Sequence, residues 1–176
     1  IEIAASDQLW HARVGHHREQ RTRYPQHALQ HLAERLGANR AVGADDIGAE
    51  ITEVDLRSVD DAPFEEIHHA LLENEVLFFP GSNLDDESQM ALAHRFGQPS
   101  VFPVLKLMGA TGPTFQVIED GPDSPNEANY WHTDVTWTED PPKVALLRAG
   151  VVPEFGGDTM WGSMTTAYDA LSPVMQ

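Results

Sequence analysis

The chain of 176 residues contains no cysteine. Disulfide bonds, zinc–thiolate sites and cysteine nucleophiles are therefore excluded as sources of its stability or chemistry. It also lacks any run of about 18 apolar residues, the length that a membrane-spanning helix needs. Its first residues show no basic segment followed by an apolar one, as a secretion signal would. We therefore expect a cytoplasmic protein that does not cross a membrane.

Positive charge is scarce, and its distribution is uneven. The formal net charge is −17, with 11 Lys and Arg against 28 Asp and Glu. Residues 1–46 are balanced, with 6 basic and 6 acidic residues, so residues 47–176 carry the whole excess, with 5 against 22. Such a surface repels polyanions and anionic lipids, so we expect neither nucleic acid nor membrane as a partner. A small anionic substrate is still allowed, because one arginine in a pocket can outweigh a distant field.

Residues 1–46 also differ from the remainder in their patterning. Residues 25–39 predict a short amphipathic helix, with leucines at helical spacing, Pro25 near the start and Gly37 as the stop. Residues 11–25 are polar, basic and aperiodic, which predicts a mobile segment. We therefore interpret residues 1–46 as an N-terminal extension that is partly flexible.

From Ile47 onward, strand and helix signals are clearer. The pattern predicts a strand at 49–56, a helix at 61–74, a buried strand at 75–81 and a helix at 84–99. Beyond Pro99 it predicts strands at 101–109, 114–120, 132–137, 143–152 and 159–164, a polar loop at 121–129 and a last helix at 165–171. Helices followed by short strands with Gly and Pro turns favour an α+β protein built on a β-sandwich or barrel.

The stretch NYWHTDVTW, residues 129–137, carries the clearest chemical signal. On a strand, residues two apart project to the same face, so His132 and Asp134 would lie side by side. An imidazole nitrogen and a carboxylate oxygen are two of the three ligands of the 2-His-1-carboxylate site that holds Fe(II). A His-x-Asp pair is common by itself, but Trp131 and Trp137 flank this one and a polar loop leads into it. We therefore predict a metal site at this pair.

Other histidines and other motifs give weaker signals. His27 and His31 are four residues apart, the spacing of two ligands on one helical face, but Ala28 stands where a zinc protease has its glutamate. A zinc-dependent hydrolase using these two histidines is the least favoured alternative. The sequence has no G-x-S-x-G elbow, no G-x-x-x-x-G-K loop and no G-x-G-x-x-G motif, so hydrolases and nucleotide-binding enzymes of those kinds are not indicated.

Successive blocks of the sequence together resemble one family. In order, they are IGAEITEVDLRSVDD, LLENEVLFFPG, ALAHRFGQP, NYWHTDVTW and PPKVALLRAGVVPEFGGDTMWGSMTTAYDALSP. They resemble the taurine dioxygenase (TauD/TfdA) family of Fe(II)- and 2-oxoglutarate-dependent dioxygenases, from about Ile47 to Gln176. The resemblance implies a double-stranded β-helix (jelly-roll) core with flanking helices. Residues 47–176 would be the N-terminal part of that domain, with the core incomplete at the C-terminus.

The resemblance also implies roles for individual residues. His132 and Asp134 match the first two iron ligands, and Thr159 in GGDT matches the threonine that contacts the cosubstrate 2-oxoglutarate. The family reaction uses O₂ to convert 2-oxoglutarate to succinate and CO₂ while it hydroxylates a small organic substrate. In members that act on sulfonates and sulfate esters, the hydroxylated product then breaks down to an aldehyde and sulfite or sulfate.

The sequence departs from the family pattern in three ways. No histidine follows Asp134, and Arg148, the last arginine, is too near the metal pair to match the arginine that binds 2-oxoglutarate. Phe102 and Leu105 replace two polar groups of the taurine enzymes, which implies a more apolar substrate wall, facing Val135. The N-terminal extension has no counterpart in the family.

Two hypotheses about function follow. The first is an oxidoreductase that uses Fe(II), 2-oxoglutarate and O₂ to hydroxylate a small sulfonate, alkyl sulfate or related acid. The alternative is a truncated, catalytically inactive homologue that acts as a binding or assembly partner. In either case, strands that would cover the apolar wall are missing. We therefore expect an exposed apolar patch larger than the roughly 300–600 Å² usual for a monomer, and a homo-oligomer.

Overall fold

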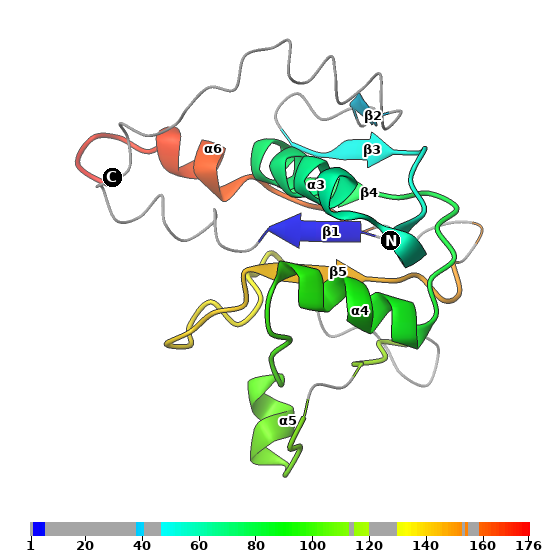
Figure 1. Cartoon of the computed structure of the whole chain (residues 1–176). Helices are drawn as coiled ribbons and strands as arrows, with labels where there is room; N and C mark the ends of the chain where they lie inside the picture. Colours follow the sequence, from blue (N-terminus) through cyan, green and yellow to red (C-terminus); the bar gives the residue numbers. More distant parts are fainter. Residues whose placement is uncertain are drawn as a thin grey trace.

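A computed structural model of the chain describes residues 2–5, 38–40, 47–112, 115–119, 130–152, 154 and 159–176 (Figure 1). Within these residues, five strands form one sheet in the order β2-β3-β4-β1-β5. The strands are β1 (Glu2–Ala5), β2 (Ala38–Arg40), β3 (Ala49–Ile51), β4 (Val76–Phe78) and β5 (Val144–Leu147). The sheet is mixed, because β3 and β4 are parallel whereas β1 is antiparallel to both of its neighbours.

Two helices lie over this sheet, α3 near β3 and β4 and α4 beside β5 (Figure 1). α3 (Asp61–Asn74) is the crossover between the parallel strands β3 and β4, and α4 (Asp86–Phe96) follows β4. Shorter elements are the 3-10 turn η1 (Leu56–Ser58), α5 (Pro103–Leu107) and α6 (Met164–Asp169). No helix in the described part of the chain is long and apolar enough to span a bilayer.

The core forms where α3 meets the sheet. Phe64, Ile67 and Leu71 are buried at the spacing that places them on one face of a helix. They pack in one cluster with Ile51 of β3, Leu77 of β4 and Leu92 of α4, and with Phe79, which follows β4. Full burial of one such side chain contributes about 1.5–3 kcal/mol, so this cluster dominates the stability of the described fold.

Leu71 and Leu72 offer a matched test of this core. The side chain of Leu71 is fully buried, whereas its neighbour Leu72 is 39% exposed. We expect Leu71→Ala to lower the free energy of unfolding by about 2–5 kcal/mol, because it leaves a cavity in the cluster. Leu72→Ala should lower the free energy of unfolding by less than about 1.5 kcal/mol, because folding buries less of this side chain. Urea unfolding of both variants measures the difference, and equal losses would contradict the burial described.

A capping box fixes the start of α4. Asp85 is the N-cap; its side chain accepts the backbone N–H of Ser88 at 2.8 Å, and its own N–H donates to the Ser88 hydroxyl at 3.0 Å. The hydrogen bonds from the side chain and backbone of Ser88 lower the pKa of Asp85, because they stabilise its ionised form. This support is present above the ordinary pKa of a free aspartate and is lost as the pH falls through the lowered value.

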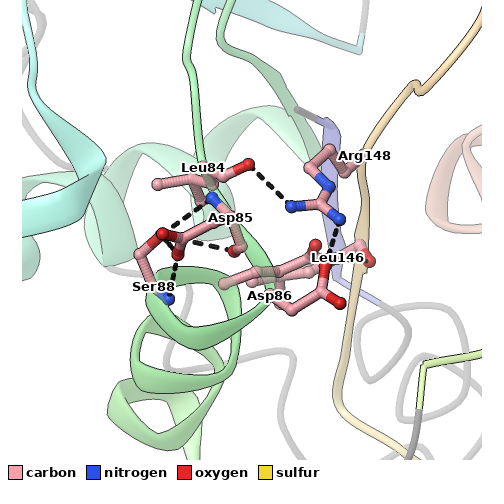
Figure 2. Close-up of polar contacts among 7 residues, drawn as sticks. Leu84, Asp85, Asp86, Ser88, Leu146 and Arg148 are labelled. Atoms are coloured by element: carbon pink, nitrogen blue, oxygen red, sulfur yellow. Dashed lines mark hydrogen bonds and ion pairs between the residues drawn. The ribbon is translucent and has the colours of Figure 1, made fainter.

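α4 is also tied to β5 by two long-range contacts. Arg148, the residue after β5, donates to the carbonyl oxygen of Leu84 at 2.6 Å and pairs with the carboxylate of Asp86 (Figure 2). On the same helix, the buried Gln89 donates from its amide to the carbonyl of Leu146 at 3.3 Å. The N-terminal half of α4 is therefore held against the strand that precedes Arg148.

Between residues 47 and 99 the predicted helices and strands are confirmed in type and order, with shorter strands than predicted. The helix predicted at 61–74 is α3 with the same bounds, and the one at 84–99 is the shorter α4. The strands predicted at 49–56 and 75–81 are confirmed only over β3 and β4, each three residues long, and Leu56 belongs to η1 instead. The helix predicted at 165–171 is α6, which begins one residue earlier. Together with the mixed sheet, these elements confirm the α+β class.

Most of the strands predicted beyond Pro99 are wrong. Residues 103–107 form α5, because Pro103 suits the first position of a helix and the apolar pattern there is not strictly alternating. Residues 115–119, 132–137 and 159–163 have no regular structure, and the strand predicted at 143–152 is confirmed only over β5. These segments have the composition of strands, but strand formation also needs a partner to pair with.

Parts of the N-terminal prediction fall outside the described residues. Residues 11–37, which include the predicted mobile segment and most of the predicted helix at 25–39, are among them, as is the predicted loop at 121–129. Ala38 and Asn39, at the end of that predicted helix, belong to β2. Both β1 and β2 come from the N-terminal extension, and the boundary at residue 46 stays a prediction.

Candidate metal site

The two side chains predicted to bind a metal are neighbours. Nε2 of His132 lies 3.2 Å from Oδ1 of Asp134. Two donors about 2.1 Å from one ion, at right angles to each other, would be about 3 Å apart. The spacing therefore matches adjacent ligands of a single ion. Residues 132–137 form bends and turns rather than a strand, so the proximity does not arise from strand alternation as the sequence predicted.

The backbone of Tyr130 determines which nitrogen of His132 faces Asp134. Nδ1 of His132 lies 2.9 Å from the carbonyl oxygen of Tyr130. A carbonyl oxygen only accepts, so Nδ1 donates, and in the neutral ring the lone pair is on Nε2. That lone pair then faces a carboxylate oxygen, an arrangement that needs a proton or a cation between the two atoms. Metal-binding histidines commonly donate their other nitrogen to a carbonyl in this way, so the donor set fits a divalent cation.

Val135, next to Asp134, holds the turn in a strained backbone conformation. Its φ is +56°, a region that β-branched residues rarely adopt, and its side chain is buried. Thr138 secures the turn, since both its N–H and its hydroxyl donate to the carbonyl of Val135, at 3.2 and 2.9 Å. Strain of this kind costs on the order of 1–3 kcal/mol and is concentrated at functional sites. The turn therefore holds the backbone next to Asp134 in one conformation.

The pair is open to solvent. The side chain of His132 is 43% exposed and that of Asp134 is 65% exposed. Two shallow pockets of about 300 and 230 Å³ lie elsewhere, between residues 53 and 84, and neither is lined by the pair. Within the part of the chain that the structure describes, no third His, Asp or Glu joins the two to complete a metal-binding group.

The segment that carries Thr159 lies beside the segment that carries the pair. Thr159 is exposed and irregular, and its four predecessors are outside the described residues. The indole of Trp131 covers Gly162, where an added Cβ would lie 3.5 Å from Cζ3 of the ring. Ser163, the N-cap of α6, donates from its hydroxyl to Oε1 of Glu75 at 3.0 Å. Residues 159–163 are therefore held between Trp131 and the end of α3.

Phe102 and Leu105 were predicted to share a strand, and this is wrong. Phe102 is the N-cap of α5 and is 37% exposed, and Leu105 is half-buried within that helix. Residues three apart lie on one side of a helix, so the two side chains can still belong to one surface. That this surface faces Val135 and lines a substrate pocket stays a prediction.

Arg148 is occupied by structural contacts. Its guanidinium binds the carbonyl of Leu84 and the carboxylate of Asp86 (Figure 2). This supports the interpretation that Arg148 is not the arginine that would bind a cosubstrate carboxylate.

Sequence analysis missed three features of the site. These are the carbonyl of Tyr130, the positive φ of Val135 and the contact of Trp131 with Gly162. The first two are backbone properties that residue identity does not reveal. A glycine three residues after GGDT was the only available signal for the third, because a glycine often marks a place where another group approaches the backbone.

Comparison with known proteins places the sequence in a family. The model described as "Taurine catabolism dioxygenase TauD, TfdA family" matches residues 34–176. An alkylsulfatase of Acinetobacter baylyi is 38% identical over 150 residues, which are 84% of this chain and 46% of that protein. An alpha-ketoglutarate-dependent sulfate ester dioxygenase of Pseudomonas putida is 42% identical over 127 residues, 71% of this chain and 41% of that protein.

A third relative extends the range of chemistry. An (S)-phenoxypropionate/alpha-ketoglutarate-dioxygenase of Sphingobium herbicidovorans is 37% identical over 128 residues, 70% of this chain and 44% of that protein. The chain thus spans about half the length of the curated relatives that it matches. The family match includes His132, Asp134, Thr159 and helices α3 to α6. On this match, which covers most of its length, the chain belongs to the TauD/TfdA family of taurine catabolism dioxygenases.

Proposed function

We propose that the whole protein is an Fe(II)- and 2-oxoglutarate-dependent dioxygenase that hydroxylates a small organic substrate. The observation that carries the proposal is the His132–Asp134 pair, with its donor atoms 3.2 Å apart and Nδ1 of the imidazole engaged by the carbonyl of Tyr130. Membership of the TauD/TfdA family supports it. We further propose that the described sheet is part of a jelly-roll core in the whole protein.

Each part of the site has a separate role in this proposal. His132 and Asp134 are two of the three Fe(II) ligands, and the metal supplies the chemistry with O₂. The carbonyl of Tyr130 keeps Nε2 of His132 free to ligate, and the strained turn at Val135 holds the backbone next to Asp134. The hydroxyl of Thr159 donates to a carboxylate of 2-oxoglutarate. The third ligand and the cation that pairs with this cosubstrate lie outside the described residues.

The reaction balances without any other reductant. A substrate C–H bond, O₂ and 2-oxoglutarate give a C–OH bond, succinate and CO₂. One oxygen atom enters the new hydroxyl and the other enters succinate. Two electrons come from the C–H bond and two from the oxidative decarboxylation, which together reduce O₂.

We infer that the substrate class is an alkyl sulfate or a related acid with an apolar chain. Two relatives are named for alkyl sulfate and sulfate ester chemistry. The exposed Phe102 and the half-buried Leu105 offer apolar surface to an alkyl chain. Hydroxylation of the carbon that bears the sulfate gives a hemiacetal sulfate. Its C–O bond to sulfate breaks, the bonding electrons leave with sulfate, the hydroxyl loses its proton, and an aldehyde forms.

The whole protein reconstituted with Fe(II) tests the proposal. It should be supplied with 2-oxoglutarate and O₂ and with hexyl sulfate, taurine or an aryloxy acid in separate reactions. We expect substrate-dependent succinate formation, with hexyl sulfate releasing one sulfate for each succinate. Omission of Fe(II) or 2-oxoglutarate should abolish both products. No substrate-dependent succinate from any of the three classes would contradict the proposed substrate range, and turnover that is independent of Fe(II) would contradict the mechanism.

Thr159→Val tests the cosubstrate contact, because valine keeps the shape of threonine and removes its hydroxyl. A hydrogen bond to a charged group contributes about 1.5–3 kcal/mol, so the Kd for 2-oxoglutarate should rise roughly 10- to 100-fold. Quenching of tryptophan fluorescence during a 2-oxoglutarate titration measures it. Thr166→Val, an exposed position in α6, is the control and should leave the Kd unchanged. An unaltered Kd in Thr159→Val would exclude the contact.

A further inference from the structure

β1 is inserted in the sheet between two strands that do not otherwise pair (Figure 1). Its Ile3 lies opposite Leu77 of β4 on one side and Leu146 of β5 on the other. β1 is antiparallel to both, so β4 and β5 run in the same direction on either side of it. Adjacent strands are about 4.8 Å apart, so β4 and β5 enclose a slot one strand wide.

The slot borders the core. In β4, the side chains of Val76 and Leu77 are 3% and 0% exposed. In β5, Val144 and Leu146 are partly buried and pack against the core cluster. An empty slot would expose this surface and leave backbone N–H and C=O groups unpaired along both strands. The slot therefore requires an extended segment as occupant.

The occupant comes from outside the family match. That match begins at residue 34, whereas β1 is residues 2–5. Residues 6–37 separate β1 from β2, and a connection of this length can reach at most about 110 Å when fully extended. The connection therefore does not by itself determine which copy of the chain supplies the strand.

We propose that the β4–β5 slot is a strand-binding site and that β1 is a separable occupant, which a second copy of the chain can supply in exchange. The exchanged form keeps every β1 hydrogen bond to β4 and β5, because the same residues meet in the same register. The two forms differ in which copy of the chain supplies β1 to the slot. The partner that fits the slot is thus residues 2–5 of a second copy, bound by strand addition.

The absence of native cysteine allows a direct test by disulfide trapping. Ala4 and Ala145 are register partners across β1 and β5. Partners in antiparallel strands have Cα atoms about 4.5–5.5 Å apart, within the range that a disulfide bridges. Ala4→Cys/Ala145→Cys should therefore form an intrachain disulfide under mild oxidation at low concentration. In Ala4→Cys/Leu147→Cys the two Cα atoms are about 8 Å apart, too far for a disulfide, so this pair is the control.

Exchange itself is tested by mixing two single variants, Ala4→Cys and a tagged Ala145→Cys. A disulfide between them forms efficiently only when β1 of one copy occupies the slot of the other. After joint refolding at high concentration, we expect at least ten times more of this mixed dimer than of either homodimer. A peptide of residues 1–6 in excess should suppress it, and the same peptide with Ile3→Pro should not, because proline cannot donate to a neighbouring strand.

The outcomes separate the two parts of the proposal. Equal cross-linking of the register pair and the Leu147 control, or none in either, would show that β1 is not held in this slot. An intrachain disulfide without any enrichment of the mixed dimer would overturn exchange. The mixed dimer enriched and suppressed only by the native peptide would support both parts.

Discussion

His132→Ala is expected to reduce Fe(II)-dependent succinate formation by the whole protein by more than about 100-fold while leaving it folded. The imidazole supplies one of the two ligand atoms of the pair, and nothing else among the described residues could replace it. Its side chain is 43% exposed, so its removal leaves no cavity in the core. The free energy of unfolding should change by less than about 1 kcal/mol. Succinate assays, iron content and urea unfolding of the same preparation measure the three effects.

Two further variants distinguish ligation from a general effect of substitution. Asp134→Asn keeps the size of the side chain and removes its charge, so iron affinity should fall as it does in His132→Ala. His94→Ala changes another exposed histidine, at the end of α4, and should retain both iron and activity. Turnover retained in His132→Ala, or lost equally in His94→Ala, would exclude the assignment of His132 as a ligand.

The elements that were predictable from sequence are those that local interactions determine. α3 has the predicted bounds because its apolar spacing, its acidic first turn and its position before a buried strand are all local signals. The start of α4 is equally local, since Asp85 and Ser88 form its capping box within one turn. Helices of this kind need no information about distant parts of the chain.

The strands predicted beyond Pro99 depended on partners that sequence does not specify. Residues 103–107 are rich in Val and Leu, but with no neighbouring strand to pair with and Pro103 at the first position, they form a helix. Conversely, nothing in residues 2–5 predicted a strand in the interior of the sheet, because their partners lie more than seventy residues away, in β4 and β5. Pairing over such distances is a property of the tertiary fold.

In the candidate site, too, some features follow from the local sequence and others depend on the folded backbone. Strand alternation predicted that His132 and Asp134 would be neighbours, and they are, although a turn rather than a strand brings them together. The imidazole is hydrogen-bonded to the carbonyl of Tyr130, and the backbone next to Asp134 turns at Val135 with a positive φ. Backbone features like these have no sequence signature, so the proximity of the two residues could be predicted and the geometry of the pair could not.

The 176-residue chain expressed alone is expected to self-associate through exposed apolar side chains. Leu107 and Met108, at the end of α5, are 88% and 78% exposed, and Val117, Val151 and Met160 are also largely exposed. Isolated exposed apolar residues are normal on a protein surface, but Leu107 and Met108 are adjacent, and adjacent exposed apolar side chains favour association. Light scattering after size-exclusion chromatography should show oligomers whose size rises with concentration.

Substitution of α5 tests where this association originates. Leu107→Lys/Met108→Lys should shift the chain toward the monomer without a loss of stability, because both side chains are already exposed. Val174→Lys, at a position 95% exposed beyond α6, is the control and should leave the oligomers unchanged. Because α5 is not part of the β4–β5 slot, the double lysine variant should still give the mixed disulfide of β1 exchange. Association by apolar contact and association by strand exchange are thus separable.

The unsubstituted 176-residue chain also tests whether its metal site is complete. Two ligands hold an ion weakly, so the 176-residue chain should bind Fe(II) with a much lower affinity than the whole protein. Equilibrium dialysis against Fe(II) measures this difference. In the light-scattering experiment, a monodisperse monomer at every concentration would contradict the self-association predicted from the exposed apolar side chains. Tight binding of one Fe(II) per chain would require a third ligand from this chain, and the histidines of residues 1–46 would then be the first to replace by alanine.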